Sequence, residues 1–289
     1  SELYLYADDA KLFRHILSDL DRGLLQRDLD NLSNWTEKWL LKLNVNKCKY
    51  MSYERSHSDT SLNQYTIGGV NLEHVEVMKD LGVKFDVKLK FTDHIKINKA
   101  YGVLGLIKRN FQYLSEKCFV TLYKAMVRSH LEYAQAVWSP HLVGHIKNIE
   151  KVQMRATKII TRIKDLSYVE RMKKLQLPTL KYRRLRGDMI ELYKMVTGLY
   201  SKDVSLNLEY VTSNLRGNKY KLYQGQLHYN LRKFSFSNRV IKLWNDLPDA
   251  VVGAENLNGF KNALDKFWFH QEVKFDWKAE ILRPGSHNT

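Results

Sequence analysis

Two adjacent carboxylates, Asp8 and Asp9, follow Tyr6 and Ala7 near the start of the sequence. Apolar runs flank the pair, and Asp tolerates tight turns, so the pattern predicts a β-hairpin over residues 2–16 with the acids at its tip. Carboxylates at a rigid tip can supply oxygen ligands to Mg²⁺, as nucleotidyl transfer with two metal ions requires. Taken alone, residues 6–9 also fit an ordinary solvated turn.

The residues after the hairpin predict the elements that must hold it. Leucines and tryptophans recur every three or four residues over 21–43, which predicts an amphipathic helix. We expect Trp35 and Trp39 to anchor this helix under a sheet, and a stacking role on nucleic acid is the alternative. A strand over 48–53 and a loop over 54–64 follow. Short strands are then predicted at 65–67, 70–72, 75–78 and 81–85, with a turn at Gly68 and Gly69.

The chain becomes helical after Thr92, which is expected to cap a helix over 93–113. Helices at 116–137 and 145–163 would complete a three-helix bundle. The rest is predicted helical at 167–175, 179–200, 237–246 and 256–270, and mixed over 203–235. We therefore expect an α+β fold. Its four parts would be 1–91, 92–163, a mostly helical region at 164–282, and a tail at 283–289.

The chain carries 47 basic and 31 acidic residues, a formal net charge of +16, which indicates a polyanionic partner. Basic and apolar residues occupy different faces of the helix predicted at 145–163, so a cationic stripe would face outward and could follow a phosphate backbone. A solvated helix face is the alternative, and the charge alone also fits a ribosomal or membrane-surface protein. The expected nucleic-acid contacts are Lys147, Lys151, Arg155, Lys158 and Arg162 in the stripe, then Arg183 and Arg184.

Other kinds of site find little support in the sequence. Cys48 and Cys118 have neither zinc nor disulfide spacing, and the ten histidines are scattered. Neither a glycine-rich phosphate loop nor a nucleophile elbow occurs. No stretch reaches the roughly 18 apolar residues of a membrane span, and no signal peptide is visible. We therefore expect an intracellular protein, in the nucleus and cytoplasm, without a membrane partner.

Five groups of residues, in order along residues 1–270, resemble the reverse transcriptases of jockey-like non-LTR retrotransposons. Tyr6–Asp9 is similar to the catalytic hairpin motif of that family. The others resemble its Trp-containing helix with a Leu-Asn-x-x-Lys run, the stretch leading into its thumb, the end of a thumb helix, and a C-terminal block. In this sequence they are Leu32–Trp35 with Trp39–Cys48, Leu81–Phe85 with Phe91–Ile95, Tyr133–Ala134 with Val137–Pro140, and Phe236–Arg239 with Leu243–Pro248.

The resemblance implies a partial palm at 1–91, built from the hairpin, a helix and one small antiparallel sheet. A helical thumb at 92–163 and a basic C-terminal region at 164–282 would follow. Asp8 and Asp9 would bind Mg²⁺, together with a further Asp from an upstream segment that this sequence lacks. Tyr6 and Ala7 would lie near the primer terminus. Lys47 would act near the leaving pyrophosphate, with an ordinary solvated lysine as the alternative. The implied partners are an RNA template, a DNA primer and, in the full-length enzyme, deoxynucleoside triphosphates, whereas the oligomeric state is open.

Because the sequence opens within a strand, we expect a fragment of an RNA-directed DNA polymerase. Alone it would bind nucleic acid without extending a primer. The first alternative is a non-catalytic nucleic-acid-binding remnant of a retroelement. The second is a basic scaffold protein of other ancestry, which a hairpin lying apart from the Trp35/Trp39 helix would favour.

Overall fold

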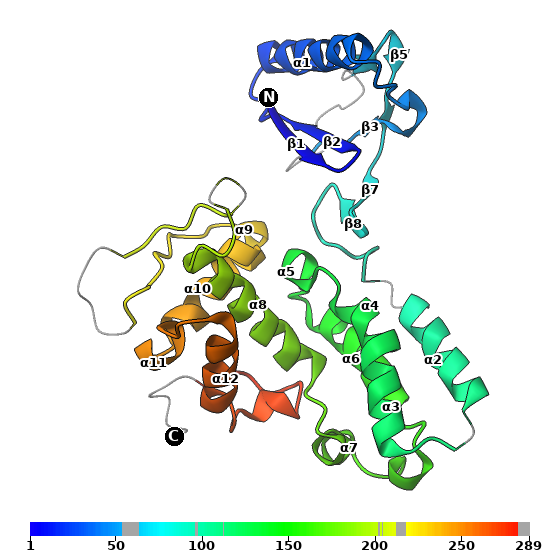
Figure 1. Cartoon of the computed structure of the whole chain (residues 1–289), viewed down its shortest axis with the longest axis vertical. Coiled ribbons are helices and arrows are strands. Elements are labelled where there is room, and N and C mark those ends of the chain that lie inside the picture. Colours follow the sequence, from blue (N-terminus) through cyan, green and yellow to red (C-terminus); the bar gives the residue numbers. More distant parts are fainter. Residues whose placement is uncertain are drawn as a thin grey trace. The chain divides into compact units, whose positions relative to one another are not determined.

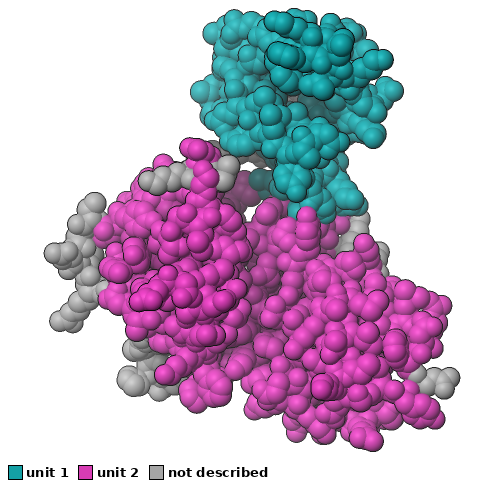
Figure 2. Space-filling model, viewed as in Figure 1, with its two compact units in different colours: residues 1–90 teal, residues 91–289 magenta. Residues whose placement is uncertain are grey.

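The structure is a computed structural model, and it describes residues 1–53, 64–95, 98–111, 113–201, 203, 205–211 and 218–282. The chain divides into two compact units, Ser1–Lys90 and Phe91–Thr289, which we call the N-terminal and C-terminal units (Figure 2). Helices and short strand pairs build the described residues, which confirms the α+β class. The four-part division stays a prediction, and its tail at 283–289 lies outside the described residues.

A two-stranded antiparallel hairpin opens the N-terminal unit, as predicted (Figure 1). Its strands are β1 (Glu2–Tyr6) and β2 (Asp9–Phe13), and Tyr6 faces Asp9 in the last pair before the turn. Runs rich in Leu, Tyr and Phe on both sides of a two-residue turn account for this pairing.

Helix α1 (Asp19–Lys38) follows the hairpin. It begins at a capping box, in which the Ser18 hydroxyl accepts from the Asp21 N–H and the Asp21 carboxylate accepts from the Ser18 N–H. It ends at Lys38 rather than at the predicted residue 43. The physical reason is Leu40, whose left-handed φ of 56° is incompatible with an α-helix.

The remaining strands of the N-terminal unit form separate pairs, so the prediction of one small antiparallel sheet is wrong for the described residues. Each of these strands has only two to four residues, which leaves few backbone groups for a further neighbour. Gly68 and Gly69 make the predicted turn, with left-handed φ values of 57° and 75°. The pairs are β3 (Lys49–Tyr50) parallel to β6 (Glu73–His74), β4 (Thr66–Ile67) antiparallel to β5 (Val70–Asn71), and β7 (Val77–Asp80) antiparallel to β8 (Val83–Asp86). The predicted loop at 54–64 lies almost wholly outside the described residues.

The small core of this unit corrects the prediction for the two tryptophans. Leu25 and Leu29 of α1 pack against a cluster of buried residues from the strand region, and Ser33 and Thr36 are buried on the same helix face. Trp35 and Trp39, by contrast, are 51% and 61% exposed. Trp35 precedes Thr36 by one residue, which turns it about 100° away from the buried face. The cluster consists of Tyr65, Ile67 and Leu72.

The C-terminal unit is helical in its described part (Figure 1). The helix predicted at 116–137 is interrupted, because Ala134 takes a left-handed φ of 50°. No helix of the described residues is long and apolar enough to cross a membrane. The elements are α2 (Asn98–Asn110), α3 (Glu116–Leu122), the π-helical turn η3 (Tyr123–Arg128), α4 (Ser129–Glu132), α5 (Gln135–Trp138), α6 (Val143–Thr157), η4 (Thr161–Ile163), α7 (Tyr168–Leu175), α8 (Leu180–Val196), α9 (Asn230–Phe234), α10 (Phe236–Asn245), α11 (Asp249–Val252), α12 (Leu257–Phe267) and η5 (Glu272–Lys274).

Helix α8 joins the two halves of this unit. It contacts α5 and α6 on one side and α10 and α12 on the other. The second side is a large apolar core in which Trp244 and Phe260 are fully buried, with ring centroids 6.0 Å apart. Because α8 packs against helices on both sides, the segment predicted as a thumb, residues 92–163, is in direct contact with the region that follows it.

Glu150 of α6 is a fully buried carboxylate at the N-terminus of α8. It accepts hydrogen bonds from the Tyr168 hydroxyl at 2.5 Å and from the Leu180 N–H at 3.1 Å. Burial raises its pKa above the ordinary value, although the hydrogen bonds and the nearby Arg184 act in the opposite direction.

This burial predicts a pH-dependent effect of Glu150→Gln. A raised folded-state pKa means that the folded protein binds the proton more tightly than the unfolded chain does. The free energy of unfolding of the wild type should therefore fall, relative to the variant, as pH rises above about 4.5. Urea unfolding of both proteins at several pH values measures the difference, and a pH-independent difference contradicts the prediction.

Candidate catalytic hairpin and nucleic-acid interface

Asp8 and Asp9 lie at the exposed tip of the hairpin. Ala7 and Asp8 form the turn, and Asp9 is the first residue of β2. Ala7 has a left-handed φ of 52°, a conformation that a residue with a Cβ adopts rarely. Such backbone outliers cluster at functional sites, where the fold holds a side chain in a set direction.

Ion pairs attach the hairpin to the rest of the N-terminal unit without using the two acids. The amino group of Ser1 lies 2.8 Å from the Asp28 carboxylate of α1, and Arg14 lies 3.3 Å from Asp21. On the other side, Lys11 of β2 lies 2.5 Å from Asp80 of β7. The hairpin is therefore bonded to the first half of α1, whereas the tryptophans lie near the end of that helix.

The two carboxylates do not by themselves form a metal site. Across the described residues, no three His, Cys, Asp or Glu side chains come together in a way that could hold a metal ion. Asp8 and Asp9 offer the oxygen chemistry that Mg²⁺ prefers, but an octahedral ion needs further ligands. Water, substrate phosphates or residues outside the described part of the protein can supply these ligands.

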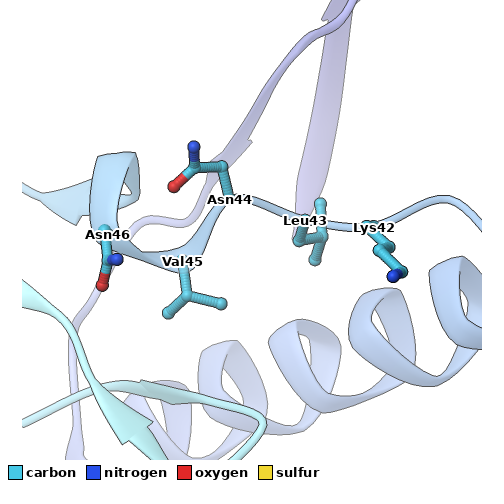
Figure 3. A pocket seen from close by; sticks show the side chains of 5 residues that line it. All are labelled: Lys42, Leu43, Asn44, Val45 and Asn46. Atoms are coloured by element: carbon cyan, nitrogen blue, oxygen red, sulfur yellow. The ribbon is translucent and has the colours of Figure 1, made fainter.

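Lys47 is exposed at the end of η1 (Val45–Lys47). It follows an open depression lined by residues 42–46, in which Asn44 and Val45 point in opposite directions (Figure 3). Val45 packs against the small core of the unit, which fixes the backbone before Lys47. In the described region, no hydrogen bond or ion pair joins Lys47 to Asp8 or Asp9, so its role beside them stays a prediction.

The predicted cationic stripe is exposed along its whole length. Ile149, Val152 and Ala156 of α6 are fully buried, which turns the basic side of the helix outward. None of the ion pairs of the described residues involves the stripe, whose members are Lys147, Lys151, Arg155, Lys158 and Arg162. The guanidinium of Arg155 lies 4.9 Å from the ring centroid of Tyr101, a cation–π contact that holds it on this surface. Because α6 ends at Thr157, the stripe continues beyond the helix into η4.

Arg183 and Arg184, the other two predicted nucleic-acid contacts, are placed differently from the stripe. Arg183 donates to both carboxylate oxygens of Glu132, one of them at 2.8 Å. Arg184 is only 4% exposed and has Glu150 and Asp188 as charged neighbours. Arg184 is buried on the part of α8 that packs against the preceding helices, so its guanidinium is out of reach of a phosphate.

A buried ion pair between α8 and α10 was not among the predicted contacts. Arg239 of α10 bonds both oxygens of Asp188 on α8, at 2.9 and 3.0 Å, and donates to the Ala136 carbonyl at 2.6 Å. Ala136 is a residue of α5, so Arg239 links α10 to both α8 and α5. A charged residue at a helix position surrounded by apolar ones, as Asp188 is, was the available signal.

Curated polymerases of mobile elements share sequence with this chain. It is 26% identical over 162 residues to the RNA-directed DNA polymerase from mobile element jockey of Drosophila melanogaster, covering 54% of this chain and 18% of that protein. The jockey polymerase of Drosophila funebris is 29% identical over 166 residues, with the same coverage. The chain is therefore similar in sequence to reverse transcriptases of retrotransposons. A Drosophila melanogaster protein described as a probable RNA-directed DNA polymerase from transposon X-element is 27% identical over 143 residues.

The relationship to these reverse transcriptases confirms the resemblance that the motifs indicated. The chain spans about a fifth of the length of the curated relatives it matches. No family model matches it. No solved structure matches it with significance either.

Proposed function

We propose that this chain forms part of an RNA-directed DNA polymerase of a non-LTR retrotransposon. The observation that carries the proposal is the Asp8–Asp9 pair, exposed at a hairpin tip with a left-handed Ala7, in a chain similar to three such polymerases. Asp8 and Asp9 would supply carboxylate oxygens to a magnesium cluster that ligands from other residues complete. The direct test uses a hybrid polymerase, in which this chain replaces the corresponding stretch of a jockey polymerase. Primer extension is compared between this hybrid and its Asp8→Asn variant.

The surroundings of the hairpin give the other proposed roles. Tyr6 and Ala7, next to the acids, would lie close to the primer terminus. Lys47 would place an ammonium near the leaving pyrophosphate, where it can stabilise negative charge. The substrates would be an RNA template, a DNA primer and deoxynucleoside triphosphates.

The cationic stripe would hold the template–primer duplex. Lys147, Lys151 and Arg155 lie on the outer face of α6, whose inner face packs in the core, so the backbone that carries them is held in place. Steps of four residues place neighbouring cations about 6 Å apart along the helix axis. Contacts of this kind with phosphates are independent of sequence and weaken as salt rises.

Charge reversal on the stripe is therefore expected to weaken nucleic-acid binding. The triple variant Lys151→Glu, Arg155→Glu and Lys158→Glu should lower the affinity of the purified chain for an RNA–DNA hybrid at least about tenfold at low salt. It should also reduce the slope of log affinity against log salt by about three, one for each lost phosphate contact. Fluorescence anisotropy with a labelled hybrid measures both quantities.

The matched control carries the same change of charge elsewhere. Lys242, Lys266 and Lys278 are exposed lysines on or after α10 and α12, and their replacement by Glu should leave affinity much closer to that of the wild type. Equal losses in both triple variants would show that only the net charge matters. Unchanged binding in the stripe variant would remove the stripe from the proposal.

A non-catalytic nucleic-acid-binding protein derived from a retroelement is the second candidate. The observation in its favour is that all five cations of the stripe are exposed in the C-terminal unit, whereas no three His, Cys, Asp or Glu side chains of the described residues form a metal site. Primer extension with Mg²⁺ separates the candidates: the hybrid polymerase extends a primer under the first and fails under the second. The purified chain is expected to bind without extension in either case.

A further inference from the structure

Residues 210–245 contain seven Lys or Arg residues and no Asp or Glu. The same stretch carries four tyrosines. A long acid-free run that mixes cations with aromatic rings is the composition of a surface that meets a polyanion. The proposed function makes no use of this run.

One part of the run is held rigidly against the core. Asn245 of α10 bonds the backbone of Leu222 twice, accepting from its N–H at 2.9 Å and donating to its carbonyl at 2.8 Å. The Trp244 indole donates to the Tyr220 carbonyl at 2.8 Å. These bonds hold the backbone of Leu222, whose side chain points into the core and is 1% exposed. The directions of the neighbouring side chains are fixed with it.

Tyr223 points outward from this fixed backbone. Tyr210 pairs with Leu222 in an antiparallel bridge, and the Tyr223 N–H donates to the Glu209 carbonyl at 2.8 Å. Successive residues of an extended strand face opposite sides, so the residue after the buried Leu222 must face solvent. The Tyr223 side chain is 56% exposed, and Tyr229, six residues on, is 53% exposed.

Helix α9 adds cations beside these rings in the chain. Arg232 and Lys233 are exposed, and neither takes part in an ion pair within the described residues. The helix is anchored at its end: the Phe234 ring stacks on His141 at 4.1 Å, and Arg239 donates to the Phe234 carbonyl at 3.3 Å. The exposed aromatic rings therefore belong to a backbone that packs against the core, as do the two cations, which have no ion-pair partner among the described residues.

We propose that Tyr223, Tyr229, Arg232 and Lys233 form a binding surface for single-stranded nucleic acid. Tyrosine rings can stack on bases that are splayed out of a single strand, whereas duplex bases are already stacked on each other. The two cations would hold the adjacent phosphates. This surface is separate from the stripe on α6 and adds strand selectivity, which a row of phosphate contacts does not supply.

The test compares two probes with the same purified chain: a uridine RNA of about 12 nucleotides and an RNA–DNA hybrid of the same length. The double variant Tyr223→Ala and Tyr229→Ala should lose about tenfold or more of its affinity for the single strand, and stay within about twofold for the hybrid. The double variant Tyr223→Phe and Tyr229→Phe keeps both rings and should retain the single-strand affinity. Thermal unfolding of each variant establishes that the fold is intact.

Replacing Arg232 and Lys233 with Gln should lower the salt slope of single-strand binding by about 1.4, from two lost phosphate contacts. Single-strand affinity that survives both alanine substitutions overturns the inference, as does an equal loss for both probes. A loss in the phenylalanine variant as large as in the alanine variant also overturns it, since stacking would not be the contact. The stripe variants are tested by their affinity for the RNA–DNA hybrid, and the tyrosine variants by their affinity for the single strand. Either proposal can therefore be contradicted without the other.

Discussion

Replacing Asp8 with Asn is expected to lower the rate of primer extension about 1000-fold. The substitution is made in the hybrid polymerase, in which this chain replaces the corresponding stretch of a jockey polymerase. A metal held by carboxylates contributes several kcal/mol to stabilising the charge of the transition state, and each 1.4 kcal/mol is a factor of about ten in rate. An amide has the same shape as the carboxylate but no negative charge, so it weakens metal binding without disturbing the turn. Primer extension with Mg²⁺ on an RNA template measures the loss.

Glu37→Gln is the control for this experiment, because Glu37 is an exposed acid on α1 and the substitution removes the same charge. It should leave extension unchanged. Asp9→Asn should also lower activity if both carboxylates serve the metal cluster. An Asp8→Asn hybrid that extends primers as fast as the unsubstituted hybrid would contradict the catalytic assignment of the hairpin.

Arg239→Met is expected to lower the free energy of unfolding of the chain by about 3–5 kcal/mol, because it leaves the Asp188 carboxylate buried without its partner. Asp188 is 3% exposed, and Arg239 is the residue that bonds both of its oxygens. The same substitution removes the donor to the Ala136 carbonyl, which couples α5 to α10. Urea unfolding followed by tryptophan fluorescence measures the loss, and Arg109→Met, at an exposed position of α2, should change stability by less than about 0.5 kcal/mol.

Two further measurements test the cause of that loss. Burial raises the pKa of Asp188, so the folded variant gains a proton as pH falls, and the deficit of Arg239→Met should shrink toward acid pH. Adding Asp188→Leu to Arg239→Met should recover much of the stability, because an apolar pair carries no buried charge. A double variant as unstable as the single one would show that the packing of Arg239, rather than its charge, is what matters.

The local sequence pattern was sufficient for the elements that carry the candidate site. The Asp8–Asp9 hairpin, the Gly68–Gly69 turn and helices α7 and α10 lie where the pattern predicts them, and α6 covers the first two thirds of its predicted range. These features depend on residues within a few positions of each other, through turn chemistry and the period of apolar side chains. The outward direction of the stripe on α6 follows from the same period.

Features that depend on distant residues were decided only by tertiary structure. The sequence places Trp35 on an apolar helix face, but the strand that packs on α1 contacts the face of Leu25 and Leu29 instead. Arg183 and Arg184 have the composition of a phosphate site, yet Arg183 is ion-paired with Glu132, about fifty residues earlier, and Arg184 is buried near Glu150.

The sequence by itself determined that the chain is basic, that it presents two acids at a hairpin tip, and that it is a relative of mobile-element polymerases. Tertiary structure decided which of its many cations are available to a polyanion. The physical reason is that burial of a charged side chain costs free energy, which carboxylates or backbone carbonyls from other elements compensate. That pairing joins residues far apart in the chain, so composition and periodicity do not reveal it.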